Sequence, residues 1–232
     1  MTDIAGAVAV VTGGQRGLGA AFTQELLARG ATKVYATARS PQQAEDPRIE
    51  PVALDVVDDE SVRALAERAA DATIVFNNAG VLFPESLLTG SMDQVRATFE
   101  TNVFGALQVA RAFAPVLAAN GGGALVDVHS LLSWGAGAGA YGASKAALWS
   151  ITNSLRLELA GQGTHVVGVH LGFADTDMVA AVPADKVSPA HVATTVLDGL
   201  GQGDTEVLVD DASRYFKAAL SGPVEGLTVP FR

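Results

Sequence analysis

A tyrosine and a lysine four residues apart, Tyr141 and Lys145, are the residues of this sequence best suited to proton-transfer chemistry. On a helix this spacing places both side chains on one face. An ammonium group beside a phenol favours the phenolate and lowers the pKa of the phenol, so the tyrosine can exchange a proton near neutral pH. Far upstream lies a glycine-rich turn, residues 12–19, of a form that binds nucleotide phosphates. Together the two segments indicate hydride chemistry.

The glycine-rich turn follows a predicted strand and opens a predicted helix, which is the context that a dinucleotide-binding turn requires. Glycines let the backbone approach a pyrophosphate closely, and free N–H groups with the helix dipole favour its negative charge. The glycine spacing differs from the common G-x-G-x-x-G fingerprint, and a tight turn that binds no ligand is the alternative. The residues of this turn expected to bind the cofactor are Gly13, Gln15, Arg16, Gly17, Leu18 and Gly19.

The end of the second predicted strand favours NADP(H) over NAD(H). An enzyme that prefers NAD usually carries an acidic residue there to bind the ribose 2′-hydroxyl, but this sequence has Arg39 and Ser40. Together with Arg16, these side chains offer positive charge and a hydroxyl to a 2′-phosphate. The alternative is that both arginines are solvated surface residues.

The ends of the next two predicted strands supply further candidate cofactor contacts. Asp55 and Val56 follow the third strand, where the carboxylate could meet the adenine amino group or, alternatively, cap the next turn. Asn78, Ala79 and Gly80 follow the fourth strand, and their small size allows close approach to a ribose or to the glycine turn. Asparagines are also ordinary turn formers, so this second signal is weak by itself.

Short apolar runs alternate with amphipathic segments along the chain, which predicts repeated βαβ units and a parallel sheet. The predicted strands are 7–12, 33–37, 51–54, 73–76, 124–128, 165–170 and 206–209. Helices are predicted at 18–29, from Asp58 toward Ala70, at 92–119 and from Ser188 onward. The helix at 92–119 is expected to begin with a capping box formed by Ser91 and Gln94 and to bend at Pro115. The stretch 135–140 is interpreted as a loop.

Composition limits the classes of function. Hydrophobic residues make up 49% of the 232 residues and charged residues 17%, which suits one folded α/β domain. The formal net charge of −10 without a basic run argues against nucleic acid as a partner. The absence of cysteine excludes thiol chemistry and fits a reducing compartment. We see no basic leader and no apolar run near 20 residues, so a cytoplasmic protein without a membrane partner is expected.

The ordered set of motifs resembles the short-chain dehydrogenase/reductase family over about residues 5–180. The motifs are the glycine turn, Asn77-Asn78-Ala79-Gly80, Asn102, an upstream serine and Tyr141-x3-Lys145. The resemblance implies a doubly wound Rossmann fold with helices on both faces of a seven-stranded sheet in the order 3-2-1-4-5-6-7. It also implies that Tyr141 is the general acid or base, and that Lys145 lowers its pKa and binds the nicotinamide ribose.

Two further catalytic roles are implied by the resemblance. Asn102 matches the family asparagine that holds a helix kink and a water, although a mid-helix asparagine can also bond the backbone locally. Ser130 has the place of the serine that binds the substrate oxygen. It lies eleven residues before Tyr141, closer than is usual, so Ser133 is the rival.

The segment after the sixth predicted strand resembles the family's Pro-Gly segment beside the nicotinamide, with Leu171 in place of the proline. Gly172, Phe173 and Thr176 are the cofactor contacts expected there. Metal binding is not expected, because the four histidines lack i, i+4 pairing. His129 beside Ser130 does not indicate a hydrolase, because strand neighbours point to opposite faces and no G-x-S-x-G surrounds the serine.

The predicted function is therefore NADPH-dependent, reversible reduction of a ketone or aldehyde. Leu131, Leu132, Trp134 and residues 173–182 are expected to wall a pocket for a small, largely apolar carbonyl or alcohol. One alternative is a non-catalytic NADP(H) sensor or scaffold, although both Tyr141 and Lys145 are present. Another is a nucleotide-sugar isomerase or dehydratase, against which the short carboxyl-terminal region argues. The resemblance implies a homodimer or homotetramer formed through the two long helices.

Overall fold

A computed structural model of the chain describes residues 2–83 and 86–229. Seven parallel strands form one twisted sheet in the order β3-β2-β1-β4-β5-β6-β7, as predicted. The strands are β1 Val8–Val11, β2 Lys33–Ala38, β3 Ile49–Ala53, β4 Ile74–Asn77, β5 Ala124–Val128, β6 His165–His170 and β7 Glu206–Leu208. Because all strands are parallel, their carboxyl ends lie along one edge of the sheet.

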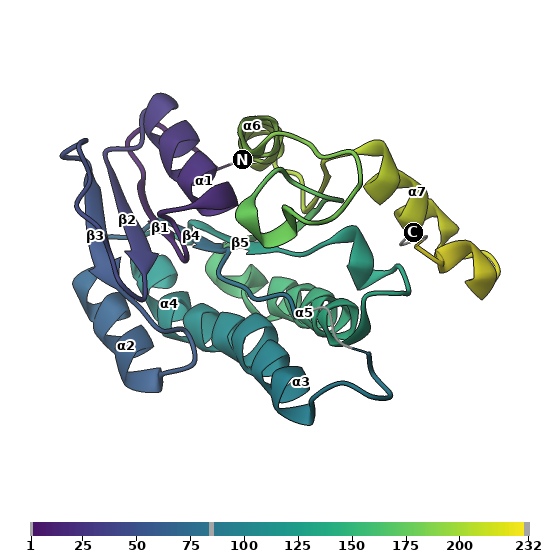
Figure 1. Cartoon of the computed structure of the whole chain (residues 1–232). Helices are drawn as coiled ribbons and strands as arrows, with labels where there is room; N and C mark the ends of the chain where they lie inside the picture. Colours follow the sequence, from purple (N-terminus) through teal and green to yellow (C-terminus); the bar gives the residue numbers. More distant parts are fainter. Residues whose placement is uncertain (1, 84–85, 230–232) are drawn as a thin grey trace.

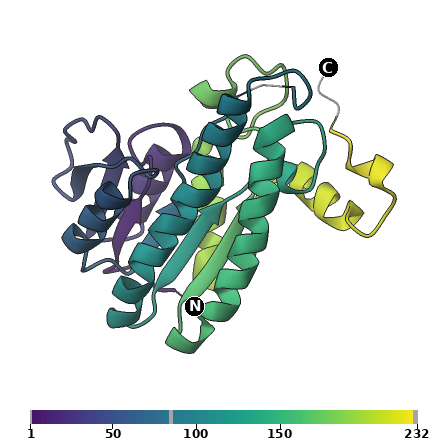
Figure 2. The same ribbon diagram turned by 90° about the horizontal axis from the view of Figure 1, so that it is seen from below.

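Helices cover both faces of the sheet, which explains why the strands are apolar almost throughout. The helices are α1 Gly17–Ala28, α2 Asp59–Arg68, α3 Met92–Phe99, α4 Ala106–Ala119, α5 Gly139–Glu158, α6 Pro189–Gln202 and α7 Asp211–Ala219. Helices α1 and α6 lie on one face and α2, α4 and α5 on the other, while α7 lies beyond the sheet (Figure 1). From below, α4 and α5 run side by side across their face (Figure 2).

Two apolar layers hold the helices to the sheet. Phe22 and Leu26 of α1 pack in one layer with Leu197 of α6. Phe113 of α4 and Leu155 of α5 pack in the other layer. The sheet therefore holds the starts of α1 and α5 in fixed positions, and each of these starts carries one of the motifs found in the sequence.

The long helical segment after β4 departs from its prediction. Its irregularity lies in the π-helical residues Glu100–Gly105 between α3 and α4, whereas α4 continues through Pro115. The Ser91 side chain accepts the N–H of Asp93, so the predicted capping-box bond at Gln94 is wrong. The helix is irregular at 100–105 because Asn102 there is hydrogen-bonded to Val81 and Ser144, and Gly105 packs against Val56.

The expectation that no segment is long and apolar enough to cross a membrane needs correction. In the part of the chain that the structure describes, Met92–Ala119 meets that test by length and composition. Core helices of globular domains pass the same test, and 44% of this apolar window is buried inside the fold.

The predicted loop at 135–140 is also too long, since α5 begins at Gly139.

Candidate active site

The glycine turn lies at the carboxyl end of β1, where its backbone takes conformations that side chains disfavour. Gly13 has a φ of +64° and Gly17 a φ of +51°, both in the left-handed region that favours glycine. A Cβ on Gly19 would lie 2.7 Å from Asn78 Nδ2 and would also collide with the carbonyl oxygen of Gly13. The turn can therefore stay this close to the β4 loop only with glycine at these positions.

Thr12, which the sequence analysis treated only as part of the turn, ties the glycine turn to the β4 loop. Its hydroxyl oxygen accepts the N–H groups of Asn78 and Ala79, each at 2.9 Å. The Asn78 side chain donates back to the Thr12 carbonyl at 2.8 Å. Asn78 and Ala79 thus shape the cradle, and no sequence motif indicated this role for a threonine at the end of a strand.

The residues expected around the 2′-phosphate lie on the glycine turn and on the β2 loop. Arg16, Arg39 and Ser40 are exposed, and neither arginine forms an ion pair with any residue that the structure describes. The side chain of Gln15 joins this turn to the β2 loop, and its contact with the cofactor stays a prediction. Its amide donates to the Gln42 carbonyl at 2.7 Å and accepts the Gln42 N–H at 2.8 Å, which holds the two loops together.

At the carboxyl end of β3, the structure favours the alternative role of Asp55. Its carboxylate accepts the N–H of Val57 at 3.2 Å, and its own N–H donates to Ser61 Oγ, so it shapes the turn before α2. Val56 is buried, and a Cβ on Gly105 would lie 2.7 Å from its side chain. Val56 therefore packs against the π-helical segment.

Asn102 lies in the π-helical segment and is almost fully buried. Its side chain accepts the N–H of Val81 at 2.9 Å, donates to the Val81 carbonyl at 3.0 Å, and donates to Ser144 Oγ at 3.1 Å. These bonds join the β4 loop to α5, one residue before Lys145. A Cβ on Gly80 would lie 3.2 Å from Asn102 Oδ1 and 3.9 Å from Lys145 Nζ, so the three residues meet.

The predicted effect of Lys145 on the pKa of Tyr141 is wrong for the chain by itself. The Lys145 ammonium lies 5.8 Å from the centre of the Tyr141 ring and donates to the Val128 carbonyl at 2.7 Å. Burial raises the pKa of Tyr141 to about 12, opposed by a hydrogen bond with the Ser130 side chain. Burial also lowers the pKa of Lys145 to about 8. The four-residue spacing alone could not reveal this, because it says nothing of desolvation.

The structure brings Ser130, and not Ser133, to the tyrosine. Ser130 shares a hydrogen bond with Tyr141, and its Oγ also accepts the N–H of Leu132 at 3.1 Å. Ser133 lies in a short 3-10 turn with its hydroxyl buried and without a hydrogen-bond partner among the described residues. The shortened loop therefore still brings the Ser130 and Tyr141 hydroxyls together.

The loop after β6 adjoins the glycine turn. A Cβ on Gly17 would lie 3.3 Å from the Thr176 methyl group, so Thr176 sits against the cradle. The Gly172 N–H donates to Asp210 Oδ2 at 2.7 Å, and the Phe173 carbonyl accepts the N–H of Val187 at 2.8 Å. These bonds hold the loop despite the leucine at position 171.

Leu131, Leu132 and Trp134, expected to wall the substrate pocket, pack in a cluster with Phe216 of α7. Tyr141 packs against the same cluster. The three residues thus fix the serine loop between the start of α5 and the carboxyl-terminal helix, and a contact with substrate stays a prediction. Behind this loop lies a group of buried polar residues that no sequence motif connects.

The residues at the carboxyl edge fit an NADP(H) molecule. The glycine turn packs against the β4 and β6 loops too closely for a Cβ at Gly19, α1 begins after Arg16 without a side-chain cap, and the turn carries the exposed cation Arg16. Within residues 2–83 and 86–229, no group of three or more His, Asp or Glu residues could hold a metal ion.

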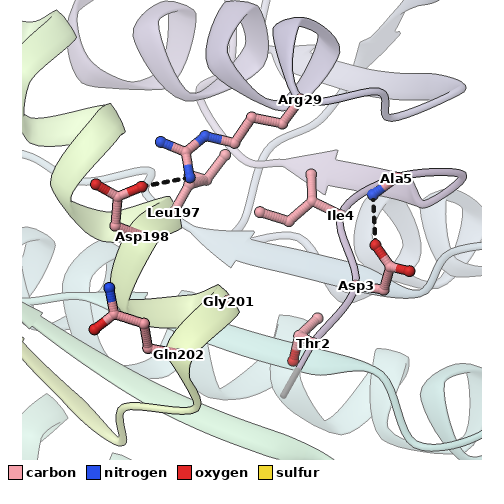
Figure 3. A pocket seen from close by; sticks show the side chains of 9 residues that line it. All are labelled: Thr2, Asp3, Ile4, Ala5, Arg29, Leu197, Asp198, Gly201 and Gln202. Carbon is pink, nitrogen blue, oxygen red and sulfur yellow. Dashed lines mark hydrogen bonds and ion pairs between the residues drawn. The ribbon is translucent and has the colours of Figure 1, made fainter.

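A separate surface hollow lies at the opposite, amino-terminal edge of the sheet (Figure 3). Arg29 of α1 forms an ion pair there with Asp198 of α6 at 2.7 Å, and Asp3 accepts the N–H of Ala5 at 3.0 Å. Its charged groups are therefore already paired, and it holds none of the predicted site residues.

Comparison with known proteins agrees with the resemblance found in the sequence. Residues 7–187 match the model of a family described as short chain dehydrogenase. An uncharacterized oxidoreductase of Myxococcus xanthus is 34% identical, covering 89% of this chain and 88% of the relative. The 1-deoxy-11-beta-hydroxypentalenate dehydrogenase of Streptomyces exfoliatus is 35% identical, covering 83% of this chain and 79% of the relative.

Solved structures are similar over almost the whole chain. A short chain dehydrogenase from Burkholderia cenocepacia, crystallised in complex with NADP, superimposes with a TM-score of 0.92 at 37% identity and covers 97% of each chain. A short-chain dehydrogenase from Streptomyces avermitilis superimposes with a TM-score of 0.83 at 26% identity, covering 94% of this chain and 93% of its own.

Proposed function

Because this chain belongs to the short-chain dehydrogenase/reductase family of oxidoreductases, we propose that it reduces a ketone or aldehyde reversibly to an alcohol with NADPH. The observation that carries the proposal is the meeting of two hydroxyl groups, Ser130 and Tyr141, at the carboxyl edge of the sheet. The NADP complex of the relative from Burkholderia cenocepacia supports the choice of cofactor.

Each side chain of the site has a separate role in the reaction at the carbonyl group. Bound NADPH would supply the hydride for the carbonyl carbon. Tyr141, protonated near neutral pH because its pKa is raised, donates its proton to the carbonyl oxygen. Ser130 donates a hydrogen bond to the same oxygen and stabilises the charge that develops on it. Lys145, one turn after Tyr141 on α5, donates to the carbonyl of Val128 in β5 and would bind the nicotinamide ribose.

The cofactor would be held by the cradle. The first N–H groups of α1 would bind its pyrophosphate, and Arg16, Arg39 and Ser40 would bind its 2′-phosphate. Gly172, Phe173 and Thr176 would hold the nicotinamide end. The substrate is expected to be small and largely apolar, because the loop around Ser130 is built from leucine and tryptophan side chains. The name of the Streptomyces exfoliatus relative, a hydroxypentalenate dehydrogenase, is consistent with alcohol or ketone chemistry.

The experiment that tests this function is NADPH oxidation, followed optically, with a panel of ketones and aldehydes. Turnover of apolar carbonyl compounds is the expected result. NADPH binding without turnover of any member of the panel would instead favour a cofactor sensor. A second measurement, the mass in solution, tests the expected homodimer or homotetramer, for which the adjacent helices α4 and α5 are the proposed interface (Figure 2).

Replacing Ser130 with alanine is expected to lower kcat by about 100-fold, since a donor to the developing oxyanion is lost. Ser133→Ala is the matched control, because the Ser133 hydroxyl is buried without a partner among the described residues. Its removal is expected to change kcat by less than about twofold. Steady-state kinetics of both variants decide between the serines, and the opposite result would assign the substrate contact to Ser133.

Replacing Arg39 with aspartate is expected to shift cofactor preference toward NADH. Loss of a charge-assisted bond to the 2′-phosphate weakens NADPH by about 10- to 100-fold, whereas NADH has no 2′-phosphate for the new carboxylate to repel. Direct titration with both cofactors measures the ratio. Arg63→Asp, an exposed arginine on α2, is the control for the change in net charge. An unchanged ratio in Arg39→Asp would remove the argument for the 2′-phosphate.

A further inference from the structure

Behind the Ser130 loop lies a network of four buried side chains, Asp127, Thr152, His129 and His170, that the proposed mechanism does not use. Each is at most 2% exposed. Asp127 and His129 come from β5 and its end, Thr152 from α5 and His170 from the end of β6. Because burial of polar groups is costly, every contact within the network must be a well-directed hydrogen bond.

The four side chains form a continuous series of short contacts. Asp127 Oδ2 lies 2.6 Å from Thr152 Oγ1, which lies 2.9 Å from His129 Nε2. His129 Nδ1 lies 3.1 Å from His170 Nε2. The series ends where His170 Nδ1 lies 3.1 Å from the Ser130 carbonyl oxygen.

The direction of every bond follows from that carbonyl oxygen, which can only accept. His170 Nδ1 must therefore carry the hydrogen, and in a neutral imidazole its Nε2 is then an acceptor. It follows that His129 donates from Nδ1 and accepts at Nε2. His129 Nε2, as an acceptor, needs the single hydroxyl hydrogen of Thr152. Thr152 Oγ1 also lies 2.8 Å from the Leu148 carbonyl oxygen, but its one hydrogen can serve only one of these two partners.

With its hydrogen used, Thr152 can only accept from Asp127, so Asp127 Oδ2 must carry a proton. The other carboxyl oxygen, Oδ1, accepts the side-chain N–H of Asn77 at 2.9 Å, which leaves Oδ2 as the protonated atom. We propose that Asp127 is held as a neutral carboxylic acid, and that it begins a one-way hydrogen-bond network whose last donor, His170, positions the backbone of Ser130.

The surroundings agree with this assignment of protons. Burial raises the pKa of Asp127, against the hydrogen bonds with Thr152 and Asn77 and the attraction of Lys145 and Arg156. Burial lowers the pKa of His129 well below its ordinary value and that of His170 to about 4, so both rings are neutral near pH 7.

Two charged neighbours bear on the assignment. Glu206 Oε1, 3.5 Å from His170 Nε2, favours a charged ring, but Glu206 is already bound by Lys217 at 2.6 Å and by Trp149 at 3.2 Å. Burial is the largest influence on the pKa of Lys145, and a charge on Asp127 would raise that pKa.

The last bond places the network in contact with the proposed chemistry. His170 is held from a second side by Trp134, whose ring stacks on it with centroids 3.9 Å apart. The imidazole thus fixes the backbone carbonyl of Ser130, the same residue whose hydroxyl meets Tyr141. The positioning role of His170 rests on the proposed function, whereas the protonation state of Asp127 does not.

Asp127→Asn tests the protonation state without any activity measurement, because asparagine can donate from Nδ2 and accept at Oδ1 as the neutral acid does. The unfolded chain ionises Asp127 above about pH 4, so a neutral Asp127 takes up one proton on folding. The unfolding equilibrium constant of the wild type, divided by that of Asp127→Asn, is therefore expected to rise about tenfold per pH unit between about pH 5 and 7.

The matched control is Asp185→Asn, at an exposed loop position, for which the same ratio is expected to be independent of pH. A ratio for Asp127→Asn that is equally flat would overturn the proposal, and so would failure of this variant to fold. Nitrogen-15 spectra of the histidine side chains give a second measurement. Both rings are expected to be neutral with the hydrogen on Nδ1, and a doubly protonated ring would place the proton on histidine and overturn the assignment.

His170→Phe and His170→Asn test the positioning role. Phenylalanine keeps a ring beneath Trp134 but cannot donate to the Ser130 carbonyl, and a decrease in kcat of about 10- to 100-fold with little change in the KM for NADPH is expected. Asparagine can donate from nearly the same place as Nδ1 and is expected to recover most of that loss. Equal activity of the wild type and His170→Phe, or no recovery with asparagine, would overturn the positioning role while leaving the proposed function intact.

Discussion

Tyr141→Phe is expected to lower kcat for carbonyl reduction by about 100- to 10,000-fold, the range for loss of a general acid. Tyr141 is half-buried and shares a hydrogen bond with Ser130, and phenylalanine at this position has no proton to donate. NADPH affinity is expected to fall by no more than about tenfold, since at most one hydrogen bond is lost. Single-turnover kinetics with the most active carbonyl compound, together with a cofactor titration, separate the two effects.

The matched control is Tyr215→Phe, which makes the same chemical change at an exposed position on α7. Its kcat is expected to equal that of the wild type. Turnover by Tyr141→Phe at the wild-type rate would refute the mechanism, because another group would then have to supply the proton. A variant that bound no cofactor would point to a structural fault at the start of α5 and would call for a folding measurement.

Gly19→Ala is expected to cause the second large effect, a joint loss of stability and of NADPH binding. The new Cβ would collide with the Gly13 carbonyl and approach Asn78 Nδ2 to 2.7 Å, and neither is the free end of a flexible side chain. The glycine turn must move away from β4, at a cost of about 2 kcal/mol or more in the free energy of unfolding. Denaturant unfolding and NADPH titration measure the two losses.

Gly201→Ala provides the matched control, because Gly201 also lies in a helix, α6, and a Cβ there meets nothing within 4 Å. Its stability is expected to stay the same or to rise by up to about 1 kcal/mol. If Gly19→Ala bound NADPH as tightly as the wild type, the cradle would not be the pyrophosphate site.

Local sequence patterns determined the fold and the location of the site. Apolar runs alternating with helical segments predicted seven parallel strands, and their order was confirmed. Strand ends in a parallel sheet share one edge, so motifs at Gly13, Asn78 and Ser130 had to converge. The Ser188-Pro189 start of α6 was likewise predictable, because a cap depends on neighbouring residues and Ser188 indeed accepts the N–H of His191.

Tertiary structure alone decided how the site residues interact. The pKa of Tyr141 is controlled by burial and by Ser130, and the helical spacing to Lys145 did not contain that information. The choice of Ser130 over Ser133 depends on how a shortened loop folds against α7, and the π-helical break depends on contacts far apart in the sequence. Periodicity and capping act between near neighbours, whereas desolvation and hydrogen-bond direction depend on everything packed around a group. For this reason the sequence located Tyr141 and Lys145, and the packed structure showed what surrounds them.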